Sequence, residues 1–292
     1  MGFGLMSNNV AIITDTTACI PQDKVNKHNI ELVPIEVIFG DKVYRDGVDI
    51  TPAEFYAMLR QADKLPTTSG SLPGAYLEAY RRANHRADGI LCITVSSKFS
   101  GMLNSARLAM KTVKEELPDL AIELVECTTA AAGQGLVVLG AARAAAAGKS
   151  LAEVVEVTRR LMHRVHLFAS LDTLHYLVKG GRVPQAAALV NSILKMKPVF
   201  SVNGGEAHTL ALPRSTESAI NNILRLMGRK IGKGKPVHVA LMHADALEQS
   251  QVLRDRIASR FNCVELFTTE FTPVIGVHTG PGVIGAAFYS ED

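Results

Sequence analysis

The segment Gly89-Ile90-Leu91-Cys92-Ile93-Thr94-Val95 decides the fold class. It is short and apolar, rich in branched residues, and followed directly by polar side chains, which is typical of a strand buried on both faces. Similar runs occur at Val10–Ile13 and Leu120–Val125. We expect the three runs to be strands of one sheet that lies inside the protein.

Helix start signals follow this type of strand along the chain. Thr51-Pro52-Ala53-Glu54 and Ser150-Leu151-Ala152-Glu153 each place a hydroxyl residue three positions before a glutamate, the pattern of a capping box. Asp245-Ala246-Leu247-Glu248 predicts a third helix start of the same kind. Alternation of strands with helices indicates a parallel sheet covered by helices.

The second half of the chain has a different pattern. Asn203-Gly204-Gly205 is a hairpin signal, and it lies between two predicted strands at Lys197–Val202 and Glu206–Leu212. A hairpin pairs its strands antiparallel, so we expect a sheet with antiparallel character here. Further predicted strands are Val237–Met242, Val264–Thr269 and Val283–Phe288.

The length of the chain predicts two domains. Its 292 residues are more than one hydrophobic core usually organises. We therefore predict an α/β protein made of two α/β domains that meet near residue 160. Residues 8–160 are expected to form the N-terminal domain, with a mainly parallel sheet. Residues 161–292 are expected to form the C-terminal domain, with a mixed or antiparallel sheet.

Composition excludes several classes of protein. Hydrophobic residues make up 47% of the chain and charged residues 20%, which is ordinary for a globular protein and not for a disordered one. The net charge is only +3, with no basic stripe, and Trp is absent, so we expect no nucleic-acid binding. The longest uncharged apolar stretch, Cys127–Ala142, is shorter than the roughly 20 residues of a membrane helix.

The cysteines and the start of the chain indicate the compartment. Four cysteines lie far apart with no CxxC pair, so we expect reduced thiols rather than disulfides or a metal site. Residues 1–9 lack the basic and apolar regions of a secretory signal. We predict a cytoplasmic protein with no metal, no cofactor and no stable membrane insertion.

Hydroxyl residues recur at the ends of the predicted strands. They occupy Thr14–Thr17, Thr67–Ser71, Ser96–Gly101 and the turn His278–Gly282. Ligands of open α/β sheets collect where strands end, and hydroxyl groups and helix N-terminal amides donate hydrogen bonds to anions. The residues alone therefore predict a small ligand with a carboxylate or phosphate head, and a phosphorylated metabolite remains an alternative.

Catalytic interpretations have less support. Ser97 and His278 are candidates for a nucleophile and base of a lipid or ester hydrolase, but no serine stands in a G-x-S-x-G elbow. A complete phosphate-binding loop is also missing. For Asp15 we favour a structural role, capping the loop after the first strand, over that of a nucleophile.

Together these segments resemble the DegV family, bacterial fatty-acid-binding proteins that present acyl chains to a fatty acid kinase. The matching stretches follow the family's order and span nearly the whole chain from about residue 10. They are Ile13–Thr17, Ile20-Pro21, Thr67–Ser69, Ser96–Gly101, Tyr176–Arg182, Lys197-Pro198 and His278–Gly282.

The resemblance implies a fatty acid held between the two domains, with its acyl chain in an apolar tunnel. Thr68 and Ser97 match the hydroxyl positions that bind the carboxylate, and His278 matches the histidine near the head group. Arg182 matches the arginine of the Gly-Gly-Arg motif, near the acyl head. The adjoining residues expected to bind the ligand are Ser69, Ser96, Thr279 and Gly280.

The resemblance also implies a partner and no catalysis by this chain. A fatty acid kinase would phosphorylate the bound acid to an acyl phosphate for phospholipid metabolism, and Arg214 corresponds to a surface arginine used in docking. Two departures from the family pattern are expected to reshape the head-group pocket. Gly70-Ser71 replaces Gln-Pro, and Met102-Leu103 replaces Thr-Tyr.

Overall fold

The computed structural model describes residues 9–182 and 196–291. Its first sheet has four strands, and every neighbouring pair is parallel, so the predicted N-terminal sheet is confirmed. The central strands β1 and β6 are buried along their whole length, as their apolar runs predict, whereas the edge strands β2 and β7 are only partly buried. In spatial order the strands are β2 (Glu31–Val33), β1 (Val10–Asp15), β6 (Gly89–Thr94) and β7 (Ala121–Glu126).

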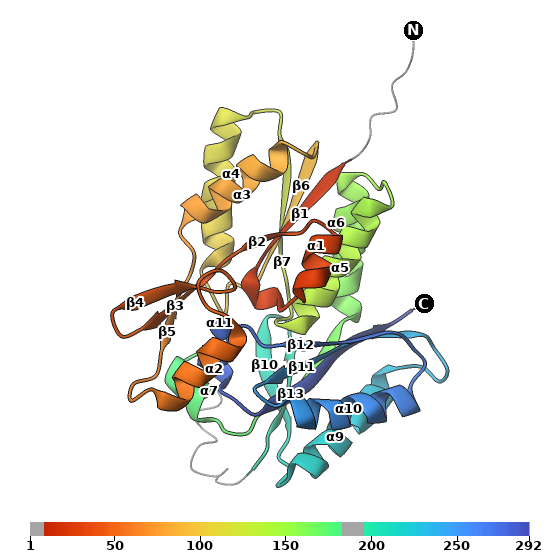
Figure 1. Cartoon of the computed structure of the whole chain (residues 1–292). Coiled ribbons are helices and arrows are strands. Elements are labelled where there is room, and N and C mark those ends of the chain that lie inside the picture. The colour runs from red at the N-terminus through yellow and green to blue at the C-terminus, as the bar shows by residue number, and fades with distance from the viewer. Residues whose placement is uncertain (1–8, 183–195, 292) are drawn as a thin grey trace.

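Helices cover both faces of the first sheet (Figure 1). One pair, α3 and α4, packs together on one face, and a second pair, α5 and α6, packs on the other. A short helix, α1, follows the turn η1 at the end of β1. The bounds are η1 (Thr16–Ala18), α1 (Gln22–Lys27), α3 (Pro73–Asn84), α4 (Met102–Glu116), α5 (Ala132–Ala146) and α6 (Leu151–Arg164).

The second sheet has six strands in the order β10-β9-β8-β13-β11-β12. Only the β11–β12 pair is parallel, so the predicted mixed sheet is confirmed. The predicted hairpin is present, and both residues of its turn, Gly204 and Gly205, have positive φ. The strands are β8 (His166–Ser170), β9 (Val199–Asn203), β10 (Glu206–Ala211), β11 (Val237–Ala244), β12 (Cys263–Glu270) and β13 (Val283–Ser290).

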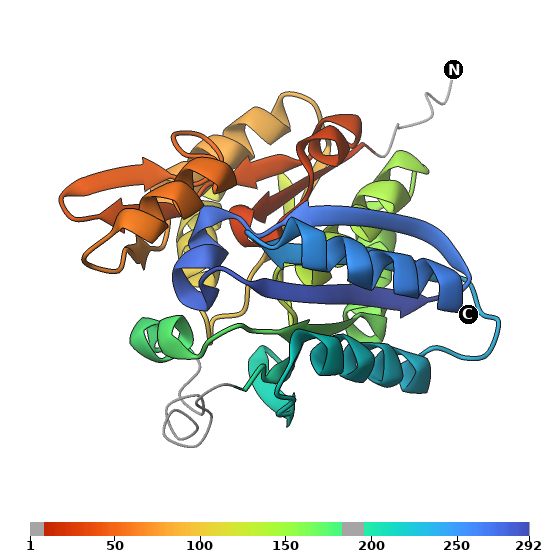
Figure 2. The same ribbon diagram turned by 60° about the horizontal axis from the view of Figure 1, so that its bottom comes forward.

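Helix α5 lies between the two sheets and is therefore buried nearly all round. It contacts β1 of the first sheet and β8, β11 and β13 of the second, and its residues are apolar except for Gln134 and Arg143. Two other helices, α9 (Thr216–Lys230) and α10 (Leu247–Arg260), cover the opposite face of the second sheet (Figure 2). Side chains along β8 point alternately to the two faces of the sheet. Leu167 and Ala169 pack in the core with α5, and Phe168 packs in the core with α9.

A third, three-stranded antiparallel sheet was not predicted from the sequence. Its strands have only three or four residues each, and β4 and β5 are mainly exposed or half-buried, so the apolar run Val37–Phe39 of β3 has no similar neighbours in the sequence. The helix α11, near the C-terminal end, packs against this sheet and against α2. The elements are β4 (Lys42–Arg45), β3 (Glu36–Phe39), β5 (Thr67–Ser69), α2 (Pro52–Gln61), α7 (His175–Gly180) and α11 (Pro273–Thr279).

The chain passes from the first sheet to the second between α6 and β8, close to the predicted boundary at residue 160. The packing of α11 on β3 and β5 brings the end of the chain back onto its first third. The division into residues 8–160 and 161–292 stays a prediction, and its limits at 8 and 292 lie outside the described residues. Within the described ranges, each helix is too short or too polar to span a membrane.

Two of the three predicted capping boxes are confirmed. The hydroxyls of Thr51 and Ser150 each accept a hydrogen bond from the backbone N–H of the glutamate three residues on. The carboxylate of that glutamate in turn accepts a hydrogen bond from the backbone N–H of the capping residue. The prediction at Asp245 is wrong. That residue has a left-handed backbone (φ 48°), its carboxylate pairs with Arg60, and the helix begins only at Leu247. The Asp245 carboxylate therefore contacts α2 and does not cap α10.

Candidate functional site

A buried carboxylate organises the end of the first strand. Asp15 accepts hydrogen bonds from the backbone N–H of Thr17 (3.2 Å) and of Val95 (2.8 Å), and from the Thr17 hydroxyl. Gln134 on α5 donates to it at 3.4 Å. Burial raises the pKa of Asp15, and these hydrogen bonds offset part of that rise. Asp15 thus caps the loop after β1, as predicted, and ties β1, β6 and α5 together.

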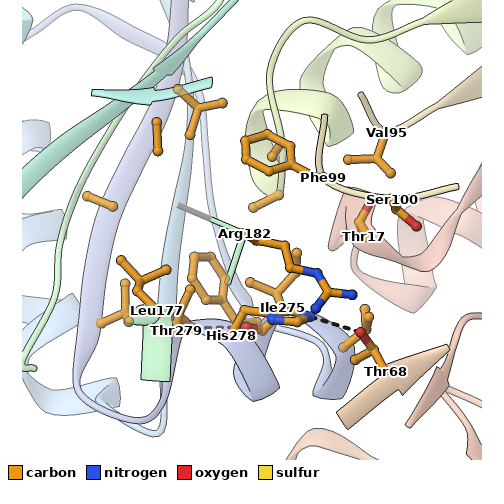
Figure 3. A pocket seen from close by; sticks show the side chains of 18 of the residues that line it. Thr17, Thr68, Val95, Phe99, Ser100, Leu177, Arg182, Ile275, His278 and Thr279 are labelled. Atoms are coloured by element: carbon orange, nitrogen blue, oxygen red, sulfur yellow. Dashed lines mark hydrogen bonds between the residues drawn. The ribbon is translucent and has the colours of Figure 1, made fainter. Parts of the chain in front are cut away.

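An apolar cavity of about 220 Å³ lies between the three sheets (Figure 3). Its walls come from both halves of the chain, because residues of the first sheet's loops face residues of the second sheet and of α11. The apolar side chains of the wall are Ile35, Val95, Phe99, Ala130, Ala131, Leu167, Ala169, Leu171, Leu177, Phe200, Val202, Ala207, Phe271, Val274, Ile275 and Val283.

Three polar side chains meet at one end of this cavity. Thr68 on β5 and His278 on α11 form a hydrogen bond of 2.9 Å between Oγ1 and Nε2. Figure 3 shows the guanidinium of Arg182, which follows α7, lying beside that pair. Burial and the charge of Arg182 lower the pKa of His278 to about 4, so the imidazole is neutral at pH 7.

Two glycines allow α7 and α11 to approach closely at this end. A Cβ atom at Gly180 would lie 2.6 Å from His278 Nδ1. Gly280 has a φ of +70°, and a Cβ atom there would collide with the ring of Tyr176. Real Cβ contacts are never this short, so each helix needs glycine where it meets the other. The Gly-Gly-Arg and His-Thr-Gly motifs therefore hold each other in place.

A second hollow, which we call the basic cleft, lies on the other side of Thr68, Arg182 and His278. This basic cleft has a volume of about 510 Å³ and shares Thr68, Arg182 and His278 with the apolar cavity. The polar end is therefore reached from the apolar cavity on one side and from the basic cleft on the other. The charged side chains of its wall besides Arg182 are Lys64, Lys179 and Asp63, so positive charge prevails.

The structure brings together part of the predicted site. Thr68, Arg182, His278 and Thr279 line the apolar cavity. The other predicted ligand-binding residues lie outside its described lining; they are Ser69, Ser96, Ser97 and Gly280. Arg214 is exposed on the connection between β10 and α9, away from the described walls of the cavity and of the basic cleft.

Ser97 and Ser96 instead bind a carboxylate of the protein. The backbone N–H and hydroxyl of Ser97 both donate to Glu126 Oε1 at 2.7 Å, and the Ser96 hydroxyl donates to it at 3.2 Å. Burial raises the pKa of Glu126, but these bonds outweigh it and the pKa is lowered. The Ser97 hydroxyl thus bonds to Glu126, while His278 bonds to Thr68, so the nucleophile–base pair of a hydrolase is not formed.

Two polar residues of the wall, Thr17 and Ser100, were not among the predicted binding residues. Both belong to hydroxyl-rich strand ends that the sequence showed, so the signal was present but did not distinguish Ser100 from Ser97. The apolar walls contributed by β8, β9 and β10 had no sequence signal, because their residues face the cavity only through tertiary packing.

Comparison with known families identifies the class of protein. The family model described as "Uncharacterised protein, DegV family" matches residues 9–291. A DegV domain-containing protein of Streptomyces coelicolor is 33% identical over 288 residues, which are 98% of this chain and 100% of the relative. Protein DegV of Bacillus subtilis is 28% identical over 95% of this chain and 98% of its own. The chain belongs to the DegV family.

Solved structures of the family have the same fold. A DegV family protein of Thermus thermophilus, described as binding a fatty acid, superposes with a TM-score of 0.90 at 30% identity, covering 97% of this chain and 100% of its own. The stearic acid-binding protein of Eubacterium ventriosum superposes with a TM-score of 0.89 at 26% identity, covering 96% and 98%. The similarity of fold therefore extends over both sheets.

The protonation of His278 provides a test of the site. We expect its imidazole to titrate at about 4, because burial and Arg182 both disfavour the charged form. Between pH 4 and about 6.5 the histidine takes up a proton in the unfolded chain but not in the folded one. The free energy of unfolding should therefore decrease as the pH falls from about 6.5 toward 4.

Histidine NMR over pH 3.5–8 would measure this pKa. Arg182→Ala should raise it, whereas Arg225→Ala, on the exposed face of α9, should leave it unchanged. A value at or above the ordinary one of about 6.5 in the unmodified protein would contradict the site as described.

Proposed function

We propose that this chain binds one long-chain fatty acid, with the acyl chain in the apolar cavity and the carboxylate against Thr68, Arg182 and His278. The observation that carries the proposal is the hydrogen-bonded Thr68–His278 pair, with Arg182 beside it, at one end of a mainly apolar cavity. The fatty acids bound by the Thermus thermophilus and Eubacterium ventriosum relatives support it.

Burial of the acyl chain supplies most of the affinity. About 16 carbons at about 0.8 kcal/mol per methylene give on the order of 10 kcal/mol gross. Ordering of the chain and loss of rigid-body freedom remove part of this. Most of the enclosing wall, from the loop after β6 to the strands of the second sheet, is apolar, and Thr17, Ser100 and Thr279 are its polar residues besides Thr68, Arg182 and His278.

The carboxylate requires donors because a bare charge is costly to bury. The guanidinium of Arg182 offers two parallel N–H groups, the geometry that suits a carboxylate. Neutral His278 can donate through Nε2 to Thr68 Oγ1, which leaves the Thr68 hydroxyl hydrogen for a carboxylate oxygen. One positive charge and one hydroxyl would thus meet the head group.

We extend the proposal to presentation of the bound acid to a fatty acid kinase. In that reaction a carboxylate oxygen attacks the γ-phosphorus of ATP, the bond from that phosphorus to the β–γ bridging oxygen breaks, and ADP leaves. The attacked carboxylate has to be reached from outside, and the basic cleft shares its three polar residues with the cavity. Positive charge from Lys64 and Lys179 suits the phosphates. The chain itself would supply no catalytic group.

Narrowing the cavity should reduce fatty acid binding. Ala207 on β10 lines the cavity, so Ala207→Phe would place a ring in the space of the acyl chain. We expect at least a tenfold loss of oleate affinity, equivalent to about 1.4 kcal/mol, by calorimetry on delipidated protein.

The matched control is His208→Phe, because His208 is the next residue on the same strand and is exposed. It should keep the affinity of the unmodified protein. Equal oleate affinity in a folded Ala207→Phe variant would rule out this cavity as the acyl site.

The role of Arg214 in docking is tested separately from binding. With ATP and the catalytic subunit of a fatty acid kinase, Arg214→Ala should slow acyl-phosphate formation on the order of threefold or more, because a charge at an interface rim mainly affects association. Oleate affinity should not change. Arg225→Ala serves as the control on the neighbouring helix, and an unaltered transfer rate for Arg214→Ala would refute the docking role.

A further inference from the structure

The tip of the β9–β10 hairpin crosses one side of the apolar cavity. β8 pairs with residues 199–201 of β9, and β10 is the edge strand of the sheet. In the part of the chain that the structure describes, no pair with β8 lies beyond Ser201. Residues 202–207, which we call the strap, therefore extend past the rest of the second sheet. Val202 and Ala207 of the strap line the cavity, so the strap is part of its wall.

The end of the strap is seated on loops of the first sheet. The backbone N–H of Gly205 donates to the carbonyl of Thr128, in the loop before α5, at 2.8 Å. Gly205 is buried although it lies in a hairpin turn, and a Cβ atom there would collide with Ser96 Oγ. Glycine is needed for an approach this close. The Ser96 hydroxyl is itself held by Glu126, so the strap meets a fixed surface.

Lys98 fastens the strap from the solvent side. Its Nζ donates to Glu206 Oε1 at 2.8 Å and to the carbonyl of Gly204 at 3.3 Å. Both side chains of this ion pair are about half exposed, 54% for Lys98 and 45% for Glu206. An exposed ion pair adds little stability and is screened by salt. The fastening is therefore weak and sensitive to ionic strength.

The polar end of the cavity is held more firmly than the strap. There the Thr68–His278 hydrogen bond joins two elements directly, and α7 packs on α11 through two glycines. Opening that end would separate packed helices. Opening the strap breaks one backbone hydrogen bond and the contacts of Lys98, and it uncovers only the small wall residues Val202 and Ala207. Of these two sides, the strap opens at the lower free-energy cost.

We propose that the strap is a gate through which an acyl chain enters and leaves the cavity. When Lys98 releases Glu206, the strap can move away from the loop of residues 96–101, whose Phe99 and Ser100 also line the cavity. The seam between strap and loop then admits the chain sideways, so a charged carboxylate does not have to cross the apolar interior. This inference rests on the proposed fatty acid binding and adds the route of exchange.

A gate has a kinetic signature that a binding contact lacks. If the strap opens more easily, association and dissociation of the fatty acid accelerate by the same factor. Kd then stays constant, because the closed state that holds the ligand is still the dominant one. Loss of a contact to the ligand instead raises the dissociation rate and Kd together.

Lys98→Met tests this signature, because it removes the charge and keeps the length of the side chain. Stopped-flow fluorescence would follow association of cis-parinarate, a fluorescent fatty acid, with the delipidated full chain and its transfer from the loaded chain to albumin. We expect both rate constants to rise on the order of threefold, with an unchanged Kd. Raising the NaCl concentration should accelerate exchange in the unmodified chain more than in Lys98→Met. Lys111→Met, on the exposed face of α4, is the matched control.

Covalent closure of the strap provides a second test. Lys98→Cys and Glu206→Cys, in a Cys263→Ser background, can be joined by a short bismaleimide, since the other three cysteines are buried. The cross-linked protein should load and release cis-parinarate at least tenfold more slowly. Lys98→Cys alone in the same background, treated with the same reagent, is the control.

The outcomes separate the gate from the binding on which it rests. Absence of saturable cis-parinarate binding to the unmodified chain would contradict the proposed function, and the gate with it. With binding intact, the gate alone is overturned if the cross-linked protein exchanges ligand as fast as its control. It is also overturned if Lys98→Met leaves both rate constants unchanged, or raises the dissociation rate and Kd in proportion.

Discussion

The hydrogen bond between Thr68 and His278 is the interaction on which the rest of the site depends. It joins β5 to α11 across 210 residues of sequence, and it stands where the apolar cavity meets the basic cleft. The imidazole in this hydrogen bond is neutral at pH 7, because burial and the neighbouring Arg182 both lower the pKa of His278. This end of the cavity thus combines one cation, Arg182, with neutral hydrogen-bonding groups.

The scaffold explains how such a polar end can adjoin an apolar cavity. Helix α5 packs between the two sheets, and Asp15 joins the loops after β1 and β6 at one wall of the cavity. On the far side, Gly180 and Gly280 let α7 and α11 pack closely enough to bring Arg182 beside His278. The cavity is what remains between these fixed elements.

The sequence predicted the fold class because buried strands such as Gly89–Thr94 carry a local signal. It predicted Thr68 and His278 because motif residues are local as well. It missed the three-stranded sheet and the apolar walls, which only tertiary packing brings together. It was wrong at Asp245, whose backbone is left-handed and whose carboxylate pairs with Arg60, 185 residues away, and not with the start of α10. Ser97 resembled Ser100 in sequence, but Glu126 engages its hydroxyl.

The central claim is that the cavity holds one fatty acid, and native mass spectrometry of the purified chain tests it most directly. After the intact mass is recorded, the protein is denatured and the released lipid is extracted and identified. The account predicts an excess mass of one fatty acid per chain, or its appearance after incubation with oleate or palmitate. A chain that is lipid-free when purified and takes up neither acid would contradict the account.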